Sequence, residues 1–400
     1  MKRTNLDTWI ETIEGIPHLT RENLEQLQLR RLNEMLKRLK ERGGIYDTYP
    51  DQLESLDQLQ TLPFTTAQML SEHPGKFLMT SQSQVSRVIS GATSGTTGPA
   101  KRVFYTEKDT EQTIGLFTAG ISEMLAAGEK CFIAFPFTGP FGLGELIAQA
   151  VERLGGYPVR AGFGQPWEEM LSLLEETRPE TYIGFPVPLL SLIRLCGQNF
   201  PVKRALVSGD ACPAGVMEEL EKMLGSKLYP HYGSRECGLG GAVTCSAFEG
   251  MHLRENHIIP EIIDEQGNVL PEAEYGELVL TTIGADAMPL LRYRTGDFTR
   301  ILPPCPCGGI TKRLDTVSRR EGEFSMEELD SVLFRIPELV DYRATWNGKL
   351  FLEVSGTLSS GEVIQEAVKG LYPNRETCVC VIPSGMQYPA YIGKRHIIRK

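Results

Sequence analysis

Residues 90–101 read Ser-Gly-Ala-Thr-Ser-Gly-Thr-Thr-Gly-Pro-Ala-Lys, and this stretch decides how the rest of the chain is interpreted. Its glycines permit positive φ angles and let main-chain N–H groups approach an anion closely. A flexible linker would have a similar composition, but strand-like segments at 87–89 and 102–105 flank the stretch on both sides. No Gly-Lys-Ser/Thr closes it, so it is not the loop of P-loop NTPases. We predict a phosphate-binding loop whose backbone, hydroxyl and ammonium donors come from Thr93, Ser94, Gly95, Thr96, Thr97, Gly98 and Lys101.

The composition is that of a globular protein with an acidic surface. Of the 400 residues, 41% are hydrophobic and 23% are charged, and the net charge is −10. This charge argues against nucleic acid and against anionic membranes as partners. No apolar run approaches the length of a bilayer span and residues 1–7 lack an apolar leader segment, so we expect a cytoplasmic protein. The odd number of cysteines, nine, points away from a disulfide framework.

The order of hydrophobic patterns predicts an α/β fold. Leucines at helical spacing over 20–42 predict an amphipathic helix. Apolar strands then alternate with amphipathic helices, which is typical of a mainly parallel sheet. From about residue 258 the pattern changes to hairpin-like strands. We therefore expect a large N-terminal domain with mainly parallel sheets and a β-rich insert (1–317), and a small α+β C-terminal domain (318–400). The predicted strands of the large sheet are 131–135, 182–185 and 205–207, and its predicted helices are 143–154, 167–177, 187–196 and 213–224.

Three further motifs have side chains suited to binding a nucleotide. In 231–236, His-Tyr-Gly-Ser-Arg-Glu, an aromatic ring can stack on a purine and a carboxylate can hold a divalent cation beside phosphates. In 292–297, Arg-Tyr-Arg-Thr-Gly-Asp, the carboxylate of Asp297 can accept two hydroxyl groups at once. Ser208, Gly209 and Asp210 follow a predicted strand and precede a helix. Each motif taken alone could be an ordinary turn.

Four residues form a separate candidate metal site: Cys245, His252, Cys305 and Cys307. Three thiolates and one imidazole are a complete ligand set for a structural zinc ion. The four could instead be unrelated, but a Cys-Pro-Cys-Gly-Gly turn is hard to account for without a bound metal. We predict a structural Zn²⁺ that fastens the β-rich insert to the large domain.

The loop and the motifs, in this order, resemble the adenylate-forming superfamily of acyl-CoA synthetases, adenylation domains and luciferases. Segments such as 62–66, 251–253, 261–264, 276–279 and 305–308 resemble its phenylacetate-CoA ligase branch in particular. The resemblance covers residues 20 to 315 and is thin beyond. It implies that the loop covers the β- and γ-phosphates of ATP and that the turn at 208–210 lies against the adenine edge. In the motif Tyr232-Gly233-Ser234-Arg235-Glu236 it places Tyr232 against adenine and Mg²⁺ on Glu236, and it assigns the ribose to Asp297 and Arg319.

Some positions differ from the family pattern. The loop has Pro99-Ala100-Lys101 where most members have Lys-Pro-Lys, so it is one cation poorer. Arg235 replaces a threonine, and its guanidinium could hold the α-phosphate or the acid substrate. The loop of about a dozen residues that usually follows the hinge is missing. Lys394 resembles the lysine that contacts the carboxylate and α-phosphate, although it could also belong to a basic tail with Arg395, His396, Arg399 and Lys400.

The resemblance implies an AMP-forming ligase that activates a carboxylic acid with ATP and transfers the acyl group to CoA. The apolar segments 135–141 and 184–186 are the predicted acid pocket and favour an aryl or small hydrophobic acid, although core packing would explain them almost as well. Transfer to a carrier protein or another acceptor, and a non-catalytic nucleotide-binding homologue, are alternatives. The branch resemblance also implies a homodimer. The predicted pocket residues are Phe137, Phe141, Gly184 and Phe185.

Overall fold

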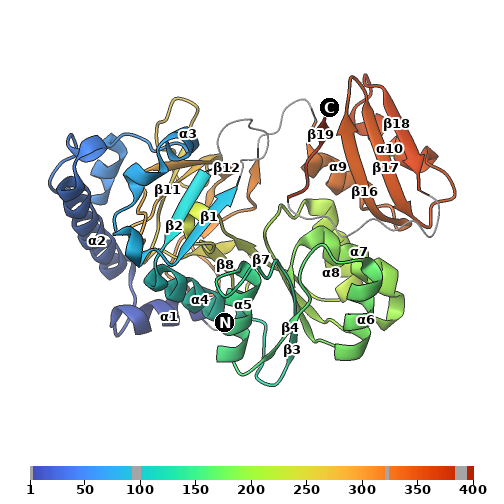
Figure 1. Cartoon of the computed structure of the whole chain (residues 1–400), viewed down its shortest axis with the longest axis horizontal. Helices are drawn as coiled ribbons and strands as arrows, with labels where there is room; N and C mark the ends of the chain where they lie inside the picture. The colour runs from blue at the N-terminus through green and yellow to red at the C-terminus, as the bar shows by residue number, and fades with distance from the viewer. Residues whose placement is uncertain (1–2, 92–100, 320–323, 383–393) are drawn as a thin grey trace. The chain divides into compact units, whose positions relative to one another are not determined.

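The computed structural model describes residues 3–91, 101–319, 324–382 and 394–400 (Figure 1). The chain divides into two compact units, and each unit combines two stretches of sequence. The first contains Met1–Glu123 and His231–Arg319, and the second contains Met124–Pro230 and Arg320–Lys400. The division into domains at 317/318 stays a prediction.

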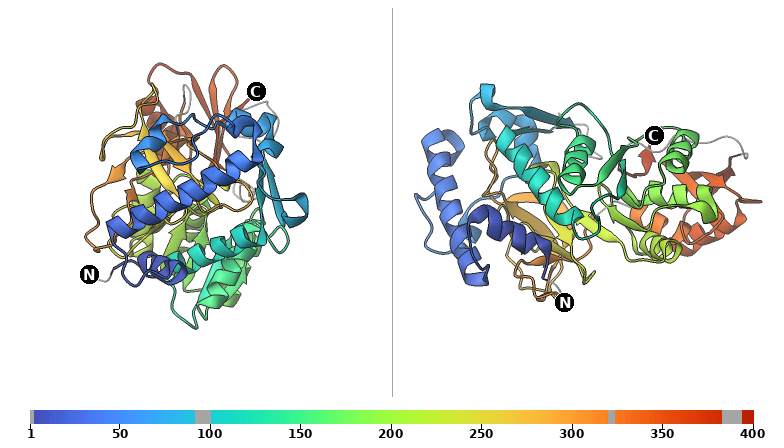
Figure 2. Two further views of the ribbon diagram at one scale, coloured as in Figure 1. Left: turned by 90° about the vertical axis from the view of Figure 1, so that its left-hand side faces the viewer. Right: turned by 90° about the horizontal axis from the view of Figure 1, so that it is seen from below.

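The helices of the first unit begin at residues suited to capping. In α2 (Arg21–Arg42), the Thr20 side chain accepts from the Asn23 N–H, and the Asn23 side chain accepts from the Thr20 N–H. Buried leucines line one face of this helix, as the spacing predicts, and Figure 2 shows it as the long blue helix of this unit. The unit also contains α1 (Asn5–Glu14), α3 (Ala67–Glu72) and α4 (Glu107–Ile121).

The strands of the first unit pair almost entirely in antiparallel fashion. The hairpin of β1 (Arg87–Gly91) and β2 (Lys101–Tyr105) confirms the strands predicted on both sides of the glycine-rich loop. A second sheet has the order β10-β11-β12-β15, and a third group has the order β13-β14-β9-β8-β7. These strands are β7 (Tyr229–Tyr232), β8 (Ala242–Thr244), β9 (Met251–Leu253), β10 (Ile259–Ile263), β11 (Gly276–Thr281), β12 (Tyr293–Thr299), β13 (Ile301–Leu302), β14 (Arg313–Leu314) and β15 (Ser318–Arg319).

The second unit contains the parallel sheet that the alternation of strands and helices predicts. Its order is β7-β6-β5-β3-β4, and all of these neighbours are parallel. Strand β7 appears in both units because the division falls between Pro230 and His231, and Tyr229 and Pro230 are the residues that pair with β6. The carboxyl ends of parallel strands lie at one edge of a sheet, where ligands of α/β proteins commonly bind. The predicted mainly parallel α/β class is therefore confirmed. The elements are β3 (Lys130–Ala134), α5 (Leu143–Arg153), β4 (Tyr157–Arg160), α6 (Trp167–Thr177), β5 (Thr181–Gly184), α7 (Pro186–Cys196), β6 (Arg204–Val207) and α8 (Ala214–Leu224).

The C-terminal part of the second unit is the predicted small α+β region. Its sheet has the order β18-β17-β16-β19, and Leu350, Leu352 and Val354 of β17 are buried. These buried residues share one hydrophobic core with α9 and α10, and this core continues into the helices of the parallel sheet. The elements are α9 (Met326–Leu333), β16 (Leu339–Trp346), β17 (Leu350–Gly356), α10 (Glu362–Leu371), β18 (Thr377–Val381) and β19 (Ile398–Arg399).

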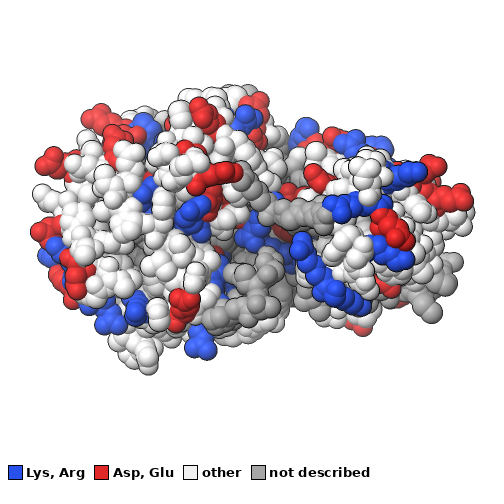
Figure 3. All heavy atoms as spheres, turned by 90° about the horizontal axis from the view of Figure 1, so that it is seen from above, with Lys and Arg blue, Asp and Glu red and all other residues white. Residues whose placement is uncertain are grey.

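Charged side chains of both signs are mixed on the surface. On the face that Figure 3 shows, acidic and basic residues are interspersed. Among the described residues, no helix combines the length and the apolar composition needed to cross a membrane.

Candidate active site

A buried ion pair lies at the start of β2, directly after the glycine-rich loop in sequence. Lys101 Nζ donates to Glu236 Oε1 at 2.5 Å and to the Tyr293 hydroxyl at 3.0 Å. The side chains of Lys101 and Glu236 are only 9% and 6% exposed. Burial by itself would raise the pKa of Glu236, but the Lys101 ammonium more than offsets this effect, and the net pKa is lowered. The residue is therefore a carboxylate at neutral pH, and a single flexible ammonium group neutralises it.

A second buried carboxylate, Asp297, lies between a tyrosine and an arginine. The Tyr232 hydroxyl donates to Asp297 Oδ2 at 2.8 Å, and Arg319 Nε donates to Oδ1 at 2.6 Å. Strand pairing explains this contact, because Asp297 on β12 and Arg319 on β15 are direct partners in the register. Two distant motifs therefore meet at one carboxylate.

The local backbone explains the glycines of these motifs. Gly296 has a φ of 72°, which disfavours residues with a Cβ, and the following Asp297 N–H donates to Thr295 Oγ1 at 3.0 Å. At Gly233 a Cβ would lie 2.1 Å from the carbonyl oxygen of Leu239, so only glycine fits there. The sequence pattern is thus explained by the turn that presents Asp297 and by the close packing behind Tyr232.

The two arginines of the 292–297 motif serve the fold. Arg292 Nε and Nη2 contact the two oxygens of Glu261 at 3.0 and 2.9 Å, and Nη1 donates to the carbonyl of Leu62 at 2.8 Å. Arg294 forms an ion pair with Glu277. Both guanidinium groups are thereby committed to neighbouring segments of the first unit.

Arg235, the unusual residue of the 231–236 motif, lies in a short 3-10 helix, Arg235–Cys237. Its carbonyl accepts a hydrogen bond from the Tyr105 hydroxyl, which fixes the main chain beside Glu236. Its half-buried side chain contributes to lowering the pKa of Glu236, after the larger effects of burial and Lys101. Ser234 contacts Cys237 Sγ through its N–H at 3.2 Å and through Oγ at 3.5 Å.

In the second unit, the predicted turn at 208–210 follows β6, at the carboxyl edge of the parallel sheet. Ser208 N–H donates to the Gly184 carbonyl at 2.9 Å, and Gly209 has a φ of 85°. A Cβ at Gly209 would lie 2.7 Å from the Phe185 ring. Asp210 Oδ1 accepts from the Ala211 N–H at 3.0 Å. The turn is therefore tightly packed against aromatic rings.

Aromatic rings gather at this edge. The Phe185 ring lies 4.9 Å from that of Phe135 and 4.5 Å from that of Phe163, measured between centroids. There is no room for a side chain at Gly184, because a Cβ there would lie 2.4 Å from the Tyr182 hydroxyl.

The other two predicted pocket residues lie apart from this cluster. Phe137 packs against Gly144 on α5, and Phe141 is half-buried. In the described part of the chain, no ring contact joins Phe137 or Phe141 to Phe185. The ring neighbours of Phe185 are Phe135, from the same predicted segment 135–141, and Phe163.

The basic segment near the C-terminus approaches Asp210 within the second unit. Arg395 N–H donates to Asp210 Oδ2 at 2.6 Å. Burial raises the pKa of Asp210 to about 6, although this hydrogen bond and the Lys394 charge act in the opposite direction. The side chain of Arg395 is buried, whereas Lys394 is exposed. The alternative of an exposed basic tail therefore does not apply to Arg395.

Three residues of these clusters were not singled out by the sequence analysis. Tyr293 lies inside a quoted motif, and its hydroxyl was the available signal. Phe163 and Arg395 had no local signal, because their partners lie elsewhere in the sequence. The predicted phosphate contacts of Thr93, Ser94, Gly95, Thr96, Thr97 and Gly98 lie outside the described residues.

The four predicted zinc ligands lie together in the first unit, and all four are buried. Their ligand atoms lie within 4.8 Å of one another. Cys245 Sγ is 3.7 Å from Cys305 Sγ, and Cys307 Sγ is 3.5 Å from His252 Nε2. A tetrahedral zinc ion with usual bond lengths would separate two sulfurs by about 3.8 Å and a sulfur from a nitrogen by about 3.6 Å. The donor set therefore fits zinc.

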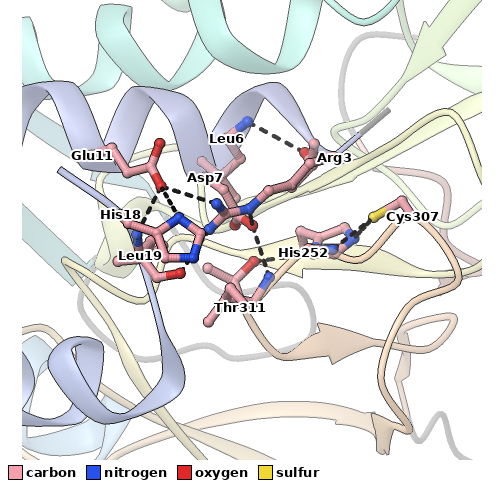
Figure 4. A network of polar contacts seen from close by, with 12 residues as sticks. Arg3, Leu6, Asp7, Glu11, His18, Leu19, His252, Cys307 and Thr311 are labelled. Carbon is pink, nitrogen blue, oxygen red and sulfur yellow. Dashed lines mark hydrogen bonds and ion pairs between the residues drawn. The ribbon is translucent and has the colours of Figure 1, made fainter. Parts of the chain in front are cut away.

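Neighbouring groups orient this cluster (Figure 4). His252 Nδ1 lies 3.0 Å from Thr311 Oγ1, so the Nε2 atom faces the thiols. The N-terminal helix α1 supports the turn, because Asp7 accepts the Ile310 N–H at 2.7 Å and also pairs with Arg3. The cluster thus joins Cys245, β9 and the 305–307 turn. Helix α1 is not part of the cluster but binds the chain just after that turn, through Asp7.

Comparison with known proteins defines the class and then the family. A family model described as AMP-binding enzyme matches residues 91–285, which contain the glycine-rich loop and Glu236. Phenylacetate-coenzyme A ligase from Aromatoleum evansii is 31% identical over 310 residues, which cover 73% of this chain and 70% of that protein. The protein of the same name from Thermus thermophilus is 28% identical over 380 residues, covering 86% and 82%. The chain belongs to the phenylacetate-CoA ligase family of AMP-binding enzymes, as the sequence predicted.

Solved structures show that the fold is shared with other adenylate-forming ligases. A crystal structure of 2-hydroxyisobutyryl-CoA ligase in the postadenylation state has a TM-score of 0.76 and 18% identity, and covers 94% of this chain and 89% of that one. An anthranilate CoA ligase in complex with anthranoyl-AMP has a TM-score of 0.53 and 15% identity, with coverages of 77% and 65%. The adenylate-forming fold is confirmed.

Proposed function

We propose that this chain is an AMP-forming acyl-CoA ligase, which activates a carboxylic acid as an acyl-adenylate and transfers the acyl group to CoA. The observation that carries the proposal is the pair of buried carboxylates, Glu236 and Asp297. Each is bound by a few single donors that a nucleotide and its cation can replace. Members of the same family are named as coenzyme A ligases.

The chemistry requires alignment and charge neutralisation more than covalent help from the protein. A carboxylate oxygen of the acid attacks the α-phosphorus of ATP, and the bond to pyrophosphate breaks. The thiol of CoA then attacks the acyl carbon, and AMP leaves in place of a poor oxide leaving group. The protein orients the acid in line with the α-phosphorus and excludes water while the adenylate exists.

The residues of the first unit suit the nucleotide. We assign the ribose hydroxyls to Asp297 and Arg319, and the adenine face to Tyr232. Glu236 would hold Mg²⁺, which supplies positive charge beside the phosphate oxygens when it is bound. Lys101, released from Glu236, can then bind phosphate oxygens.

The remaining assignments are predictions from the family resemblance. They place Lys394 at the carboxylate and the α-phosphate. The role of Arg235, which replaces the family's threonine, is proposed from guanidinium chemistry instead: it would hold the α-phosphate or the acid substrate. The loop residues 93–98 belong to the β- and γ-phosphates, and the turn 208–210 to the adenine edge.

The aromatic cluster supports a proposal for the class of acid. Phe135, Phe163 and Phe185 form an apolar wall at the carboxyl edge of the parallel sheet, beside Gly209. Such a wall suits an aryl or small hydrophobic acid, because ring stacking adds to the burial of apolar area. We infer that aryl acids are preferred over short aliphatic ones.

A second acceptor class has its own support. Fumarate–(S)-2,3-diaminopropanoate ligase from Enterobacter agglomerans is 23% identical to this chain over 358 residues, which cover 87% of that protein. Its name describes the joining of an acid to an amino compound. Transfer of the acyl group to an amine or a carrier-protein thiol is therefore the alternative to CoA.

The decisive test is acid-dependent exchange of pyrophosphate into ATP over a panel of aryl and short aliphatic acids. We expect exchange with at least one aryl acid, and thioester formation when CoA is added. Exchange without a CoA thioester, followed by product with an amine or a carrier pantetheine, would favour the alternative acceptor. ATP binding with no exchange for any acid would overturn the proposal.

We also propose that Cys245, His252, Cys305 and Cys307 hold a structural Zn²⁺. Metal analysis of the purified protein should give about one zinc per chain. Cys307→Ser should lower this content and the thermal midpoint, whereas Cys380→Ser, at an exposed cysteine, should change neither. Full zinc content in Cys307→Ser would contradict the assignment.

The cytoplasmic location and the homodimer implied by the family resemblance are further proposals. Light scattering after size-exclusion chromatography tests the dimer directly. A mass of about 45 kDa, that of one chain, would contradict it.

A further inference from the structure

The residue that follows Lys394 is held far more firmly than an exposed tail would be. The Arg395 side chain is 8% exposed. Nε and Nη2 contact the carboxylate of Asp330 at 2.9–3.1 Å, and Nη1 donates to Asp341 Oδ1 at 3.0 Å. Nη2 also lies 3.4 Å from the carbonyl of Tyr342. A lysine cannot reproduce this geometry, because an ammonium group lacks the planar fork of donors.

Aromatic rings complete the binding of this guanidinium group. Arg395 Cζ lies 4.7 Å from the ring centre of Tyr342 and 5.3 Å from that of Phe334. These distances are within the range of cation–π contacts. The Tyr342 hydroxyl donates to Asp330 Oδ1 at 2.6 Å, so the main acceptor of Arg395 is itself fixed.

The main chain of Arg395 reaches the turn after β6. Its N–H donates to Asp210 Oδ2 at 2.6 Å. Asp210 belongs to the turn that also contains Ser208 and Gly209. Lys394 is the adjacent residue, and its positive charge acts on the Asp210 carboxylate. The fixed point at Arg395 therefore lies one residue from the lysine and directly on this turn.

The elements that hold Arg395 are fastened to the helices of the parallel sheet. Ser191 Oγ on α7 donates to the Val340 carbonyl at 2.7 Å, and the buried Arg194 binds the carbonyl oxygen of Leu339. Gly215 on α8 donates its N–H to Ser331 Oγ at 3.1 Å. A Cβ at Gly215 would lie 1.8 Å from the Ser331 carbonyl oxygen, so the helices touch along their backbones. Helix α9 and strand β16, which bind Arg395, are thus themselves held in place by α7 and α8.

We propose that Arg395 is a positioning residue for adenylation, which fixes the main chain at 394–395 and so holds the Lys394 ammonium beside the turn 208–210. This inference rests on the proposed function, in which Lys394 contacts the substrate carboxylate and the α-phosphate. A lysine on an unconstrained tail would lose chain entropy each time it reached the reacting groups. Arg395 removes that cost in advance.

The test separates the two half-reactions in Arg395→Ala, Arg395→Lys and the control Arg399→Ala. Arg399 is a cation of the same segment with an exposed side chain. Adenylation is measured as pyrophosphate release with the best acid of the panel. Thioester formation is measured in single turnovers from the synthetic acyl-adenylate and CoA.

We expect Arg395→Ala to lower the kcat of adenylation by about 10²-fold and Arg395→Lys by about tenfold, with the KM for ATP changed by less than about threefold. Thioester formation from the supplied adenylate should stay within about twofold, because Lys394 acts only in the first step. Arg399→Ala should match the wild type. The double variant Lys394→Ala/Arg395→Ala should be no slower than Lys394→Ala by more than about twofold, since Arg395 acts through Lys394.

Other outcomes overturn the inference. Full adenylation in Arg395→Ala would show that the position of Lys394 does not depend on Arg395. An equal loss in both half-reactions, accompanied by a lower urea midpoint, would show a structural role alone. If the wild type itself exchanges no pyrophosphate with any acid, the proposed function fails first, and this inference fails with it.

Discussion

Two buried charged clusters, one in each unit, differ in how their carboxylates are held. In the first cluster, Glu236 is bound by the ammonium group of Lys101 and the hydroxyl of Tyr293. In the second, one guanidinium group, that of Arg395, binds Asp330 and Asp341 with several donors and lies against two rings. A ligand can replace a lysine and a hydroxyl, whereas displacement of Arg395 would leave charges buried without partners. The type and number of donors therefore distinguish a binding site from an anchor better than burial does.

The largest effect should come from removing the carboxylate of Glu236, whose donors a ligand can replace. Glu236→Gln keeps the shape of the side chain but cannot hold a divalent cation, so we expect adenylation to fall by at least about 10³-fold. Pyrophosphate release at increasing Mg²⁺ measures this. Glu14→Gln, which breaks the Arg31 ion pair of the same unit at an equally buried carboxylate, is the matched control and should retain near-wild-type activity. Equal activity in Glu236→Gln and the wild type would erase the distinction between the clusters.

Loss of the anchor carboxylate should lower the stability of the fold and, through Arg395, also the rate of adenylation. Asp330→Asn removes the charge that faces Arg395, and breaking a buried pair from one side costs about 3 kcal/mol or more. Urea unfolding, monitored by circular dichroism, measures the change. Glu366→Gln, on the exposed side of α10, is the control and should stay within about 0.5 kcal/mol of the wild type. An unchanged urea midpoint in Asp330→Asn would show that the second cluster is not an anchor.

A buried histidine on β7, His231, predicts a pH dependence of stability. Burial lowers the pKa of His231 to about 4, from an ordinary value near 6.5. The unfolded chain therefore binds a proton that the folded protein excludes between these two pH values. The contribution is fully present above about pH 6.5, and up to about 3 kcal/mol of it is lost as the pH falls to about 4.

Urea midpoints from pH 7.5 to 4 in the wild type and in His231→Gln measure this effect. The variant should lose less stability over the acidic range, because its amide does not titrate. Parallel curves for the two proteins would argue against a neutral buried His231.

The smallest effects should come from two matched hydroxyls. Tyr293 donates to Glu236 at 3.3 Å, and Tyr342 donates to Asp330 at 2.6 Å. Tyr342→Phe should lower the free energy of unfolding by about 1–2 kcal/mol with adenylation little changed. Tyr293→Phe should instead lower adenylation by about tenfold with a smaller change in stability. The reverse pattern would mean that the roles of the two clusters are exchanged.

Much of the architecture could be predicted because it depends on local patterns. Leucine spacing predicted α2, and the alternation of apolar runs with amphipathic segments predicted the parallel sheet. The motifs around Tyr232, Glu236 and Asp297 identified the family, since each places a particular chemical group at a fixed spacing. The clustering of Cys245, His252, Cys305 and Cys307 was likewise predicted from their types and the tight 305–307 turn, and the zinc ion itself stays a proposal.

The pairing of side chains could not be predicted from local patterns. Of the predicted pocket segments 135–141 and 184–186, Phe135 and Phe185 have rings in contact, and Phe163, which lies outside both segments, packs against Phe185. The partners of Arg395, Asp330 and Asp341, could not be predicted either, because the sequence around Arg395 resembles an exposed basic tail.

The sequence by itself determined the secondary structure elements, the family and the chemical groups available to a nucleotide, because periodicity and motif spacing are properties of neighbouring residues. Only the tertiary structure decided which groups meet. Lys101 pairs with Glu236 across 135 positions of sequence, and Arg395 binds Asp330 across 65. Such contacts depend on how strands and helices pack in space. The local sequence around one partner does not identify the other partner, because the two are far apart in the chain.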